Sequence, residues 1–95
     1  MRVRWTPRAR ADLREISEYL DVHLPNFSQS TVVSLCEAID SLLSSPYRGR
    51  PGREPGTREL VMTRIPYIVA YRVRSYVVEV LHIHHTSRQW PESNG

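Results

Sequence analysis

The chain has 95 residues, including thirteen arginines and no lysine, and its formal net charge is +3 at pH 7. This length allows one small domain, so we predict a single domain over residues 1–91 and a flexible tail over 92–95. No apolar run approaches the ~18 residues that cross a membrane, and no signal-peptide core is present, so we expect a soluble cytoplasmic protein. The single cysteine excludes an internal disulfide and a thiolate metal cluster.

The positive charge is concentrated in the second half of the chain. Residues 1–47 carry five arginines against six acidic residues, a net of −1, while residues 48–95 carry eight arginines against four glutamates, a net of +4. A guanidinium group is always charged and pairs bidentately with phosphate or carboxylate. The second half therefore favours a phosphate-rich or acidic partner.

The first half predicts a short strand followed by two helices. Alternation in "RVRW" predicts a strand over residues 2–5, and Thr6 with Pro7 is typical of a helix start, so a helix is expected over about 7–22. Apolar residues at helical spacing predict a second helix from near residue 26 or 28 to about 45. The short link between the two makes them an antiparallel hairpin.

A loop and three strands follow. The stretch "SPYRGRPGREPGT", residues 45–57, has the proline and glycine content of a loop. Strands are predicted at 58–64, 66–74 and 76–85, the last two forming a tight hairpin. The resulting order is β-α-α-β-β-β, an α+β fold in which the helical hairpin packs on one face of a small, mainly antiparallel sheet.

Arginines on these strands are candidates for an anion-binding surface. If Tyr71 faces the helices, Arg72 points to the uncovered face of the sheet. Arg58 begins the neighbouring strand and Arg88 follows the last one, so the three are predicted to converge there and hold an anion. The alternative is an exposed ion network with the glutamates of these strands, in which each pair contributes only ~0–1 kcal/mol.

The histidines near the end of the chain allow two interpretations. Strict alternation puts His82 and His84 on one side of the last strand, with Val80, and puts His85 on the other. Two imidazoles alone lack the third protein ligand of a zinc site, so no metal site is predicted. His85, at the strand end beside Arg88, can exchange protons with a bound phosphate ester or simply hold the strand end in place. Trp90 is either a hydrophobic anchor for the tail or a stacking platform.

The sequence from Gly49 to Pro91 resembles the RelE/ParE superfamily of type II toxin–antitoxin toxins, formerly called plasmid stabilization proteins. The segments that carry the likeness are "PGTRELV", "PYIVAYRV" and "VEVLHIHHTSRQWP", and the opening "TPRARADLREISEYL" is also similar to that family. The resemblance covers nearly the whole chain. It implies the same β-α-α-β-β-β fold and a toxin without a cofactor.

The resemblance also implies two alternative activities. RelE-like members cleave mRNA on the ribosome without metal, whereas ParE-like members block DNA gyrase without catalysis. This chain has Ile68 where the nuclease branch often has arginine. Its segments "PGTRELV" and "YIVAYRV" are more similar to those of ParE-like members, so gyrase inhibition and growth arrest are expected. In the ribonuclease alternative, His85, Arg88 and Arg72 would be catalytic. Binding of target or antitoxin is predicted for Arg58, Arg72, Arg88 and Trp90.

The implied partner is a cognate antitoxin whose C-terminal segment folds on binding, giving a hetero-oligomeric toxin–antitoxin complex. Such a segment lays an amphipathic helix in a groove or adds a strand to a sheet edge. A third interpretation is a binding module that derives from such a toxin and has lost toxicity.

Overall fold

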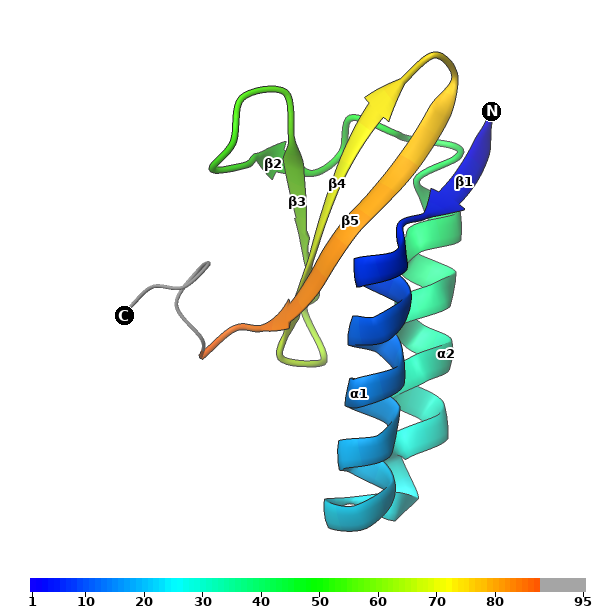
Figure 1. Ribbon diagram of the computed structural model, residues 1–95, viewed down its shortest axis with the longest axis vertical. Helices are drawn as coiled ribbons and strands as arrows, with labels where there is room; N and C mark the ends of the chain where they lie inside the picture. The colour runs from blue at the N-terminus through cyan, green and yellow to red at the C-terminus, as the bar shows by residue number, and fades with distance from the viewer. Residues whose placement is uncertain (88–95) are drawn as a thin grey trace.

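The computed structural model describes residues 1–87 and contains two helices packed on one face of a five-stranded sheet (Figure 1). The elements in chain order are β1 (Arg2–Trp5), α1 (Pro7–His23), α2 (Pro25–Ser41), β2 (Arg50–Pro51), β3 (Arg58–Val61), β4 (Tyr67–Arg74) and β5 (Val77–His85). The strand order across the sheet is β1-β5-β4-β3-β2. β1 pairs with β5 in parallel, and the other pairs are antiparallel. The predicted α+β fold class is confirmed.

The start of α1 follows the predicted capping. The Thr6 side chain accepts a hydrogen bond from the backbone N–H of Ala9 at 3.2 Å, and Pro7 occupies the first turn. Proline is suited to that turn because the N–H it lacks would have no helical partner there. Within residues 1–87 neither helix, at 17 residues each, is long and apolar enough to cross a lipid bilayer.

The second helix ends earlier than predicted. Only Leu24 separates α1 from α2, and α2 ends at Ser41 rather than near residue 45. After Ser41 the N–H groups of residues 42–44 bond to carbonyls three residues back. This spacing is that of a 3₁₀ turn, so the apolar pattern continues for a few residues after the α-helix has ended.

The loop predicted over residues 45–57 contains a short strand that the composition concealed. Arg50 pairs with Glu59 and Pro51 pairs with Arg58, which makes β2 the outermost strand beside β3. A proline is tolerated at the edge of a sheet because only one side of an edge strand is hydrogen-bonded.

The loop that leads into β2 is attached to the core by one tyrosine. The hydroxyl of Tyr71 donates to the carbonyl of Pro46 at 2.8 Å and accepts from the N–H of Gly49 at 2.9 Å. A Cβ at Gly49 would lie 2.7 Å from that hydroxyl, so only glycine allows the backbone to approach so closely. The side chain of Tyr71 is fully buried in the core, so the condition under which Arg72 points to the opposite face is met.

The last strand contains a β-bulge that reverses its alternation. Ala70 pairs with His82, but the next residue, Tyr71, pairs with Val80, so Leu81 is an extra residue in β5. An extra residue moves every later side chain to the opposite face of the sheet. The prediction that Val80 and His82 share a face is therefore wrong.

The core lies between the helices and the sheet. Its fully buried large side chains come from α2, the turn after it, β4 and β5: Leu35, Ile39, Leu42, Val69, Tyr71, Val78 and Val80. Burial of each such side chain contributes roughly 1.5–3 kcal/mol.

We predict that Leu35→Asp prevents folding, because it puts an unpaired carboxylate in the core at a cost close to the whole stability of a small domain, about 5 kcal/mol or more. Far-UV circular dichroism and urea titration would measure this. Val33→Asp, the same change at an exposed position of α2, should leave a cooperative transition. A folded Leu35→Asp protein would contradict the core assignment.

Candidate functional site

The face of the sheet opposite the helices, here called the open face, carries a cluster of charged side chains. Register and the bulge place the following residues on it: Arg2, Arg4, Glu59, Ile68, Ala70, Arg72, Arg74, Glu79, His82 and His84. The side chains toward the helices include Val78, Val80, Ile83 and His85. The open face is thus polar and the opposite face largely apolar.

Three arginines surround one glutamate on the open face; we call Arg4, Arg72 and Arg74 around Glu79 the arginine cluster. Nε of Arg72 lies 2.7 Å from Oε1 of Glu79, and NH1 of Arg4 lies 2.9 Å from Oε2. NH2 of Arg74 is 4.0 Å from Oε1. The three guanidinium groups come from the strands on either side of the glutamate. Ion pairs therefore connect β1, β5 and β4 in addition to the backbone hydrogen bonds between these strands.

The electrostatics of the cluster favour an ionised glutamate and an excess of positive charge. The side chain of Glu79 is only 8% exposed. Its hydrogen bond from Arg72 lowers the pKa of Glu79 against the opposing effect of burial, and the charges of Arg72, Arg4 and Arg74 add to the lowering. One carboxylate neutralises one of three guanidinium groups, so the cluster keeps the capacity to bind an anion.

Arg58 does not join this cluster. It pairs with Tyr71 across β3 and β4, so its side chain lies on the helix side of the sheet. Its guanidinium donates to the carbonyls of Tyr47 and Gly49 at 3.0 and 2.7 Å and lies over the Tyr47 ring. The predicted convergence of Arg58 with Arg72 on one face is wrong, because residues paired across strands share a face and Tyr71 faces the core.

The histidines on the open face have a structural partner that the sequence did not reveal. His82 and His84 are buried, and their rings stack 5.2 Å apart. Nδ1 of His82 lies 2.6 Å from Oδ2 of Asp12 in α1, and the same oxygen accepts the N–H of Ile83 at 2.9 Å. Burial, followed by the neighbouring His82, lowers the pKa of His84. Within residues 1–87, no three potential ligands are grouped to hold a metal ion.

His85 lies on the other side of the sheet. Its Nδ1 accepts the N–H of Ser87 at 3.1 Å and lies 2.8 Å from the Ser87 hydroxyl. Its ring is nearly perpendicular to the ring of Tyr67, with the two centroids 5.4 Å apart. Arg72 is on the open face, so the structure does not bring His85 and Arg72 together. Arg88 and Trp90, and the predicted tail over residues 92–95, lie outside the described residues.

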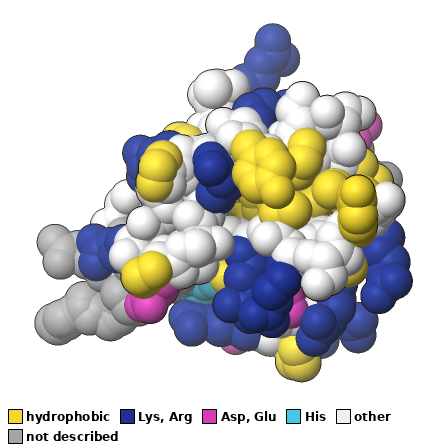
Figure 2. Space-filling model, turned by 90° about the horizontal axis from the view of Figure 1, so that it is seen from above, with side chains coloured by type: hydrophobic (Ala, Val, Ile, Leu, Met, Phe, Trp, Pro, Cys, Tyr) yellow, Lys and Arg dark blue, Asp and Glu magenta, His cyan; other side chains and the backbone are white. Residues whose placement is uncertain are grey.

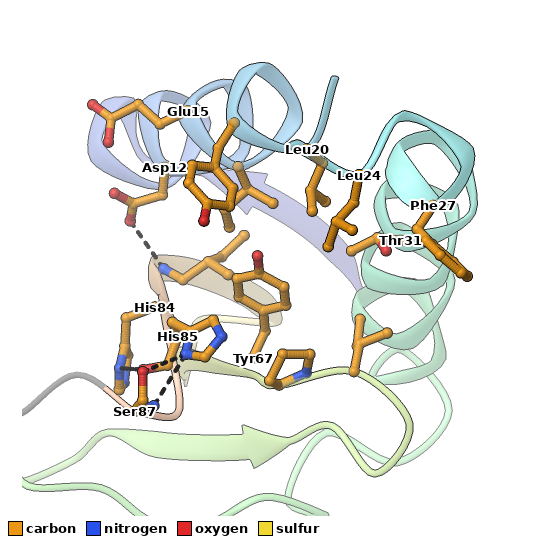
Figure 3. Close-up of a pocket in the computed structure, with 15 residues that line it drawn as sticks. Asp12, Glu15, Leu20, Leu24, Phe27, Thr31, Tyr67, His84, His85 and Ser87 are labelled. Carbon is orange, nitrogen blue, oxygen red and sulfur yellow. Dashed lines mark hydrogen bonds between the residues drawn. The ribbon is translucent and has the colours of Figure 1, made fainter. Parts of the chain in front are cut away.

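An apolar groove runs between the helices and the end of β5 where His85 lies (Figure 3). It has a volume of about 780 Å³. Leu20, Leu24 and Thr31 of the helical hairpin face Tyr67 across it (Figure 3). Asp12 and Glu15 supply acidic groups at one end. The groove therefore suits an apolar segment of a partner, and the arginine cluster suits an anionic surface.

Comparison with known proteins identifies the family. Residues 3–90 match the family described as ParE toxin of type II toxin–antitoxin system, parDE. The chain belongs to this family. The predicted membership of the RelE/ParE superfamily is confirmed, and the chain is a toxin of the type II toxin–antitoxin class.

Among three similar proteins, one is named after RelE and one belongs to a ParDE system. The inferred toxin Y4kP of Sinorhizobium fredii is 44% identical over 91 residues, 96% of this chain and 94% of Y4kP. Toxin RelE2 of Caulobacter vibrioides is 38% identical over 84 residues, 88% of this chain and 93% of RelE2. A structure of the chromosomal ParDE system from P. aeruginosa matches with a TM-score of 0.82 at 29% identity, covering 92% of this chain and 97% of that one.

We predict that Glu79→Gln lowers the free energy of unfolding by about 1–2 kcal/mol at pH 7, since charge-assisted hydrogen bonds to partly exposed arginines are lost. Because the folded state lowers the pKa of Glu79, the stabilisation is complete above the unfolded pKa of ~4.3 and disappears as pH falls through the folded value.

Urea titrations between pH 3 and 7 would measure this, and the difference between wild type and Glu79→Gln should shrink below pH 4. Glu18→Gln, at an exposed position on α1, is the control and should show no such loss at pH 7. A Glu79→Gln deficit that is the same at every pH would contradict an ionic role for Glu79.

Proposed function

We propose that this toxin arrests growth in the manner of ParE, by binding and blocking DNA gyrase, without a catalytic step of its own. The match over residues 3–90 shows the toxin family, and the target is what we propose. The observation that carries it is the separation of His85 from Arg72 on opposite faces of the sheet.

Cleavage of RNA through its 2′-hydroxyl needs a base, an acid and positive charge, all directed at one phosphate. His85 points toward the helices and is engaged with Ser87 and Tyr67. Arg72 is bonded to Glu79 on the other face. A single phosphate cannot contact both side chains, which supports a toxin that acts by binding.

The similarity to the ParDE structure also supports the ParE-like branch of the superfamily. The alternative is a ribosome-dependent mRNA endoribonuclease, favoured by the 38% identity to a toxin named RelE2 and by the Asp12–His82 pair. A carboxylate that holds one ring nitrogen orients the other for proton transfer. In this chain the other nitrogen of His82 lies 3.5 Å from a guanidinium nitrogen of Arg8, and the side chain is buried, which argues against a base that is accessible to RNA.

The proposed partner that silences the toxin is a cognate antitoxin, as the names of the ParDE and RelBE complexes imply for those proteins. The groove between the helices and β5 fits an amphipathic helix whose apolar side chains contact Leu20, Leu24 and Tyr67. The net positive charge of the chain would accelerate capture of an acidic segment.

Expression of the chain without its antitoxin tests the target. We expect growth arrest, an SOS response and intact mRNA, and we expect the purified protein to inhibit supercoiling by gyrase. His85→Ala should retain this inhibition, because inhibition by binding alone needs no proton transfer from His85.

Cuts placed at codons in primer extension, lost in His85→Ala, would instead identify a ribonuclease. Normal colonies after induction of a soluble, folded chain would identify a binding module without toxicity. Either result would overturn the gyrase proposal.

A second prediction concerns the groove. Leu24→Ala together with Phe27→Ala should weaken binding of the cognate antitoxin about 10-fold or more, since both side chains line the groove and Phe27 is 60% exposed in the free chain. Titration calorimetry would measure it. Val22→Ala is the matched control, because Val22 is 75% exposed nearby but does not line the groove. Equal effects of the two variants would remove the groove from the interface.

A further inference from the structure

The arginines at the turn end of the open face form two parallel rows. Arg2 and Arg74 are the register partners of Val77 on either side of β5, and Arg4 and Arg72 are the partners of Glu79. Adjacent strands are ~4.8 Å apart, so the arginines of one row are about 10 Å apart, and the rows are separated by about 6.6 Å along the strands. Four guanidinium groups thus cover a small flat area that, among residues 1–87, holds one carboxylate, that of Glu79.

The turn beside these rows presents an aromatic ring to solvent. Ser75 and Tyr76 form the two-residue turn between β4 and β5, with φ of 54° and 62°. A turn with two positive φ angles normally uses asparagine and glycine, because other side chains are strained there. Within residues 1–87, Tyr76 is nevertheless 80% exposed and is not among the hydrophobic side chains that pack against the core. Strain that brings no packing within the fold indicates a contact made outside it.

We propose that Arg2, Arg4, Arg72, Arg74 and Tyr76, here called the hairpin corner, form a binding site for single-stranded nucleic acid. The guanidinium groups would contact successive phosphates, and the Tyr76 ring would stack on a base. A positively charged surface with an exposed aromatic side chain is the combination that holds single strands without sequence preference.

Charge and position favour a nucleic acid over an acidic protein segment. Seen from the side of the β4–β5 turn, several arginine side chains lie together on one side of the molecule, with few carboxylates among them (Figure 2). The hairpin corner lies beside the start of β5, whereas the apolar groove lies at the end of β5, so a protein segment in the groove does not require the corner. The corner consists of four arginines and one tyrosine, so it offers no aliphatic side chains to the apolar face of an amphipathic helix.

Fluorescence anisotropy of the full chain with labelled oligo(dT) and oligo(rU) of about 12 nucleotides would test the site. Both probes should bind, and log K should fall linearly with log salt concentration. Preference for one probe would distinguish DNA from RNA as the natural ligand. A polyglutamate peptide of equal charge is the protein arm and should bind more weakly.

Single substitutions should distinguish the contribution of the arginine charges to binding from the contribution of base stacking on Tyr76. Arg2→Ala and Arg74→Ala should each lower the salt slope by about 0.7, the value for one phosphate contact on a single strand. Tyr76→Ala should weaken binding about 5- to 100-fold with the slope unchanged. Tyr76→Gly should weaken binding equally while raising the melting temperature, because glycine relieves the strain of the turn.

Arg14→Ala, which removes an exposed charge from α1, is the control for general electrostatics and should leave the slope unchanged. The proposal is overturned if neither oligonucleotide binds, if polyglutamate binds as tightly as oligo(dT), or if Arg14→Ala changes the slope as much as Arg74→Ala. Because the readout is binding by the chain alone, the result is independent of whether gyrase is the target.

Discussion

The arrangement of the whole fold depends on the junction between Thr6 and the bulge in β5. The Thr6 N–H donates to the carbonyl of Val80 at 3.1 Å, and its hydroxyl donates to the same carbonyl at 2.9 Å while accepting the N–H of Ala9. One residue therefore ends the parallel pairing of β1, begins α1 and fixes the carbonyl that precedes the extra residue, Leu81. Because α1 starts there, it runs beside the rest of β5, where Asp12 binds the N–H of Ile83.

The bulge determines on which face of the sheet each side chain of β5 lies. Before it, Glu79 faces the open side and gathers arginines from both neighbouring strands. After it, His85 faces the helices and lines the groove. If β5 alternated regularly through Leu81, His85 would share a face with Glu79 and Arg72. One inserted residue thus separates a groove for an apolar ligand from a surface for an anionic one.

The helices and strands could be predicted from the sequence because they depend on local patterns. The face on which some side chains lie could not, because it depends on which residues pair across neighbouring strands. Alternation placed Tyr71 and Arg72 correctly. It could not reveal the bulge, because Leu81, His82 and Ile83 continue a regular pattern without glycine or proline. Arg58 was misplaced because its face follows from its pairing with Tyr71, which the sequence of β3 does not contain. The contact of Asp12 with His82 could not be predicted, since nothing in the local sequence of the helix connects Asp12 with a histidine 70 positions later.

The absence of lysine from the chain has a structural consequence at Glu79. A guanidinium can bond one carboxylate oxygen through Nε or a terminal nitrogen and still direct further N–H groups outward, whereas an ammonium group offers no such fixed fork. Arg72 uses Nε and Arg4 uses NH1 toward Glu79, so each keeps donors for a ligand. The buried carboxylate holds these long side chains in place before any ligand arrives. Part of the conformational entropy that binding would otherwise remove is then already lost in the free protein, which is how one internal anion can strengthen the binding of an external one.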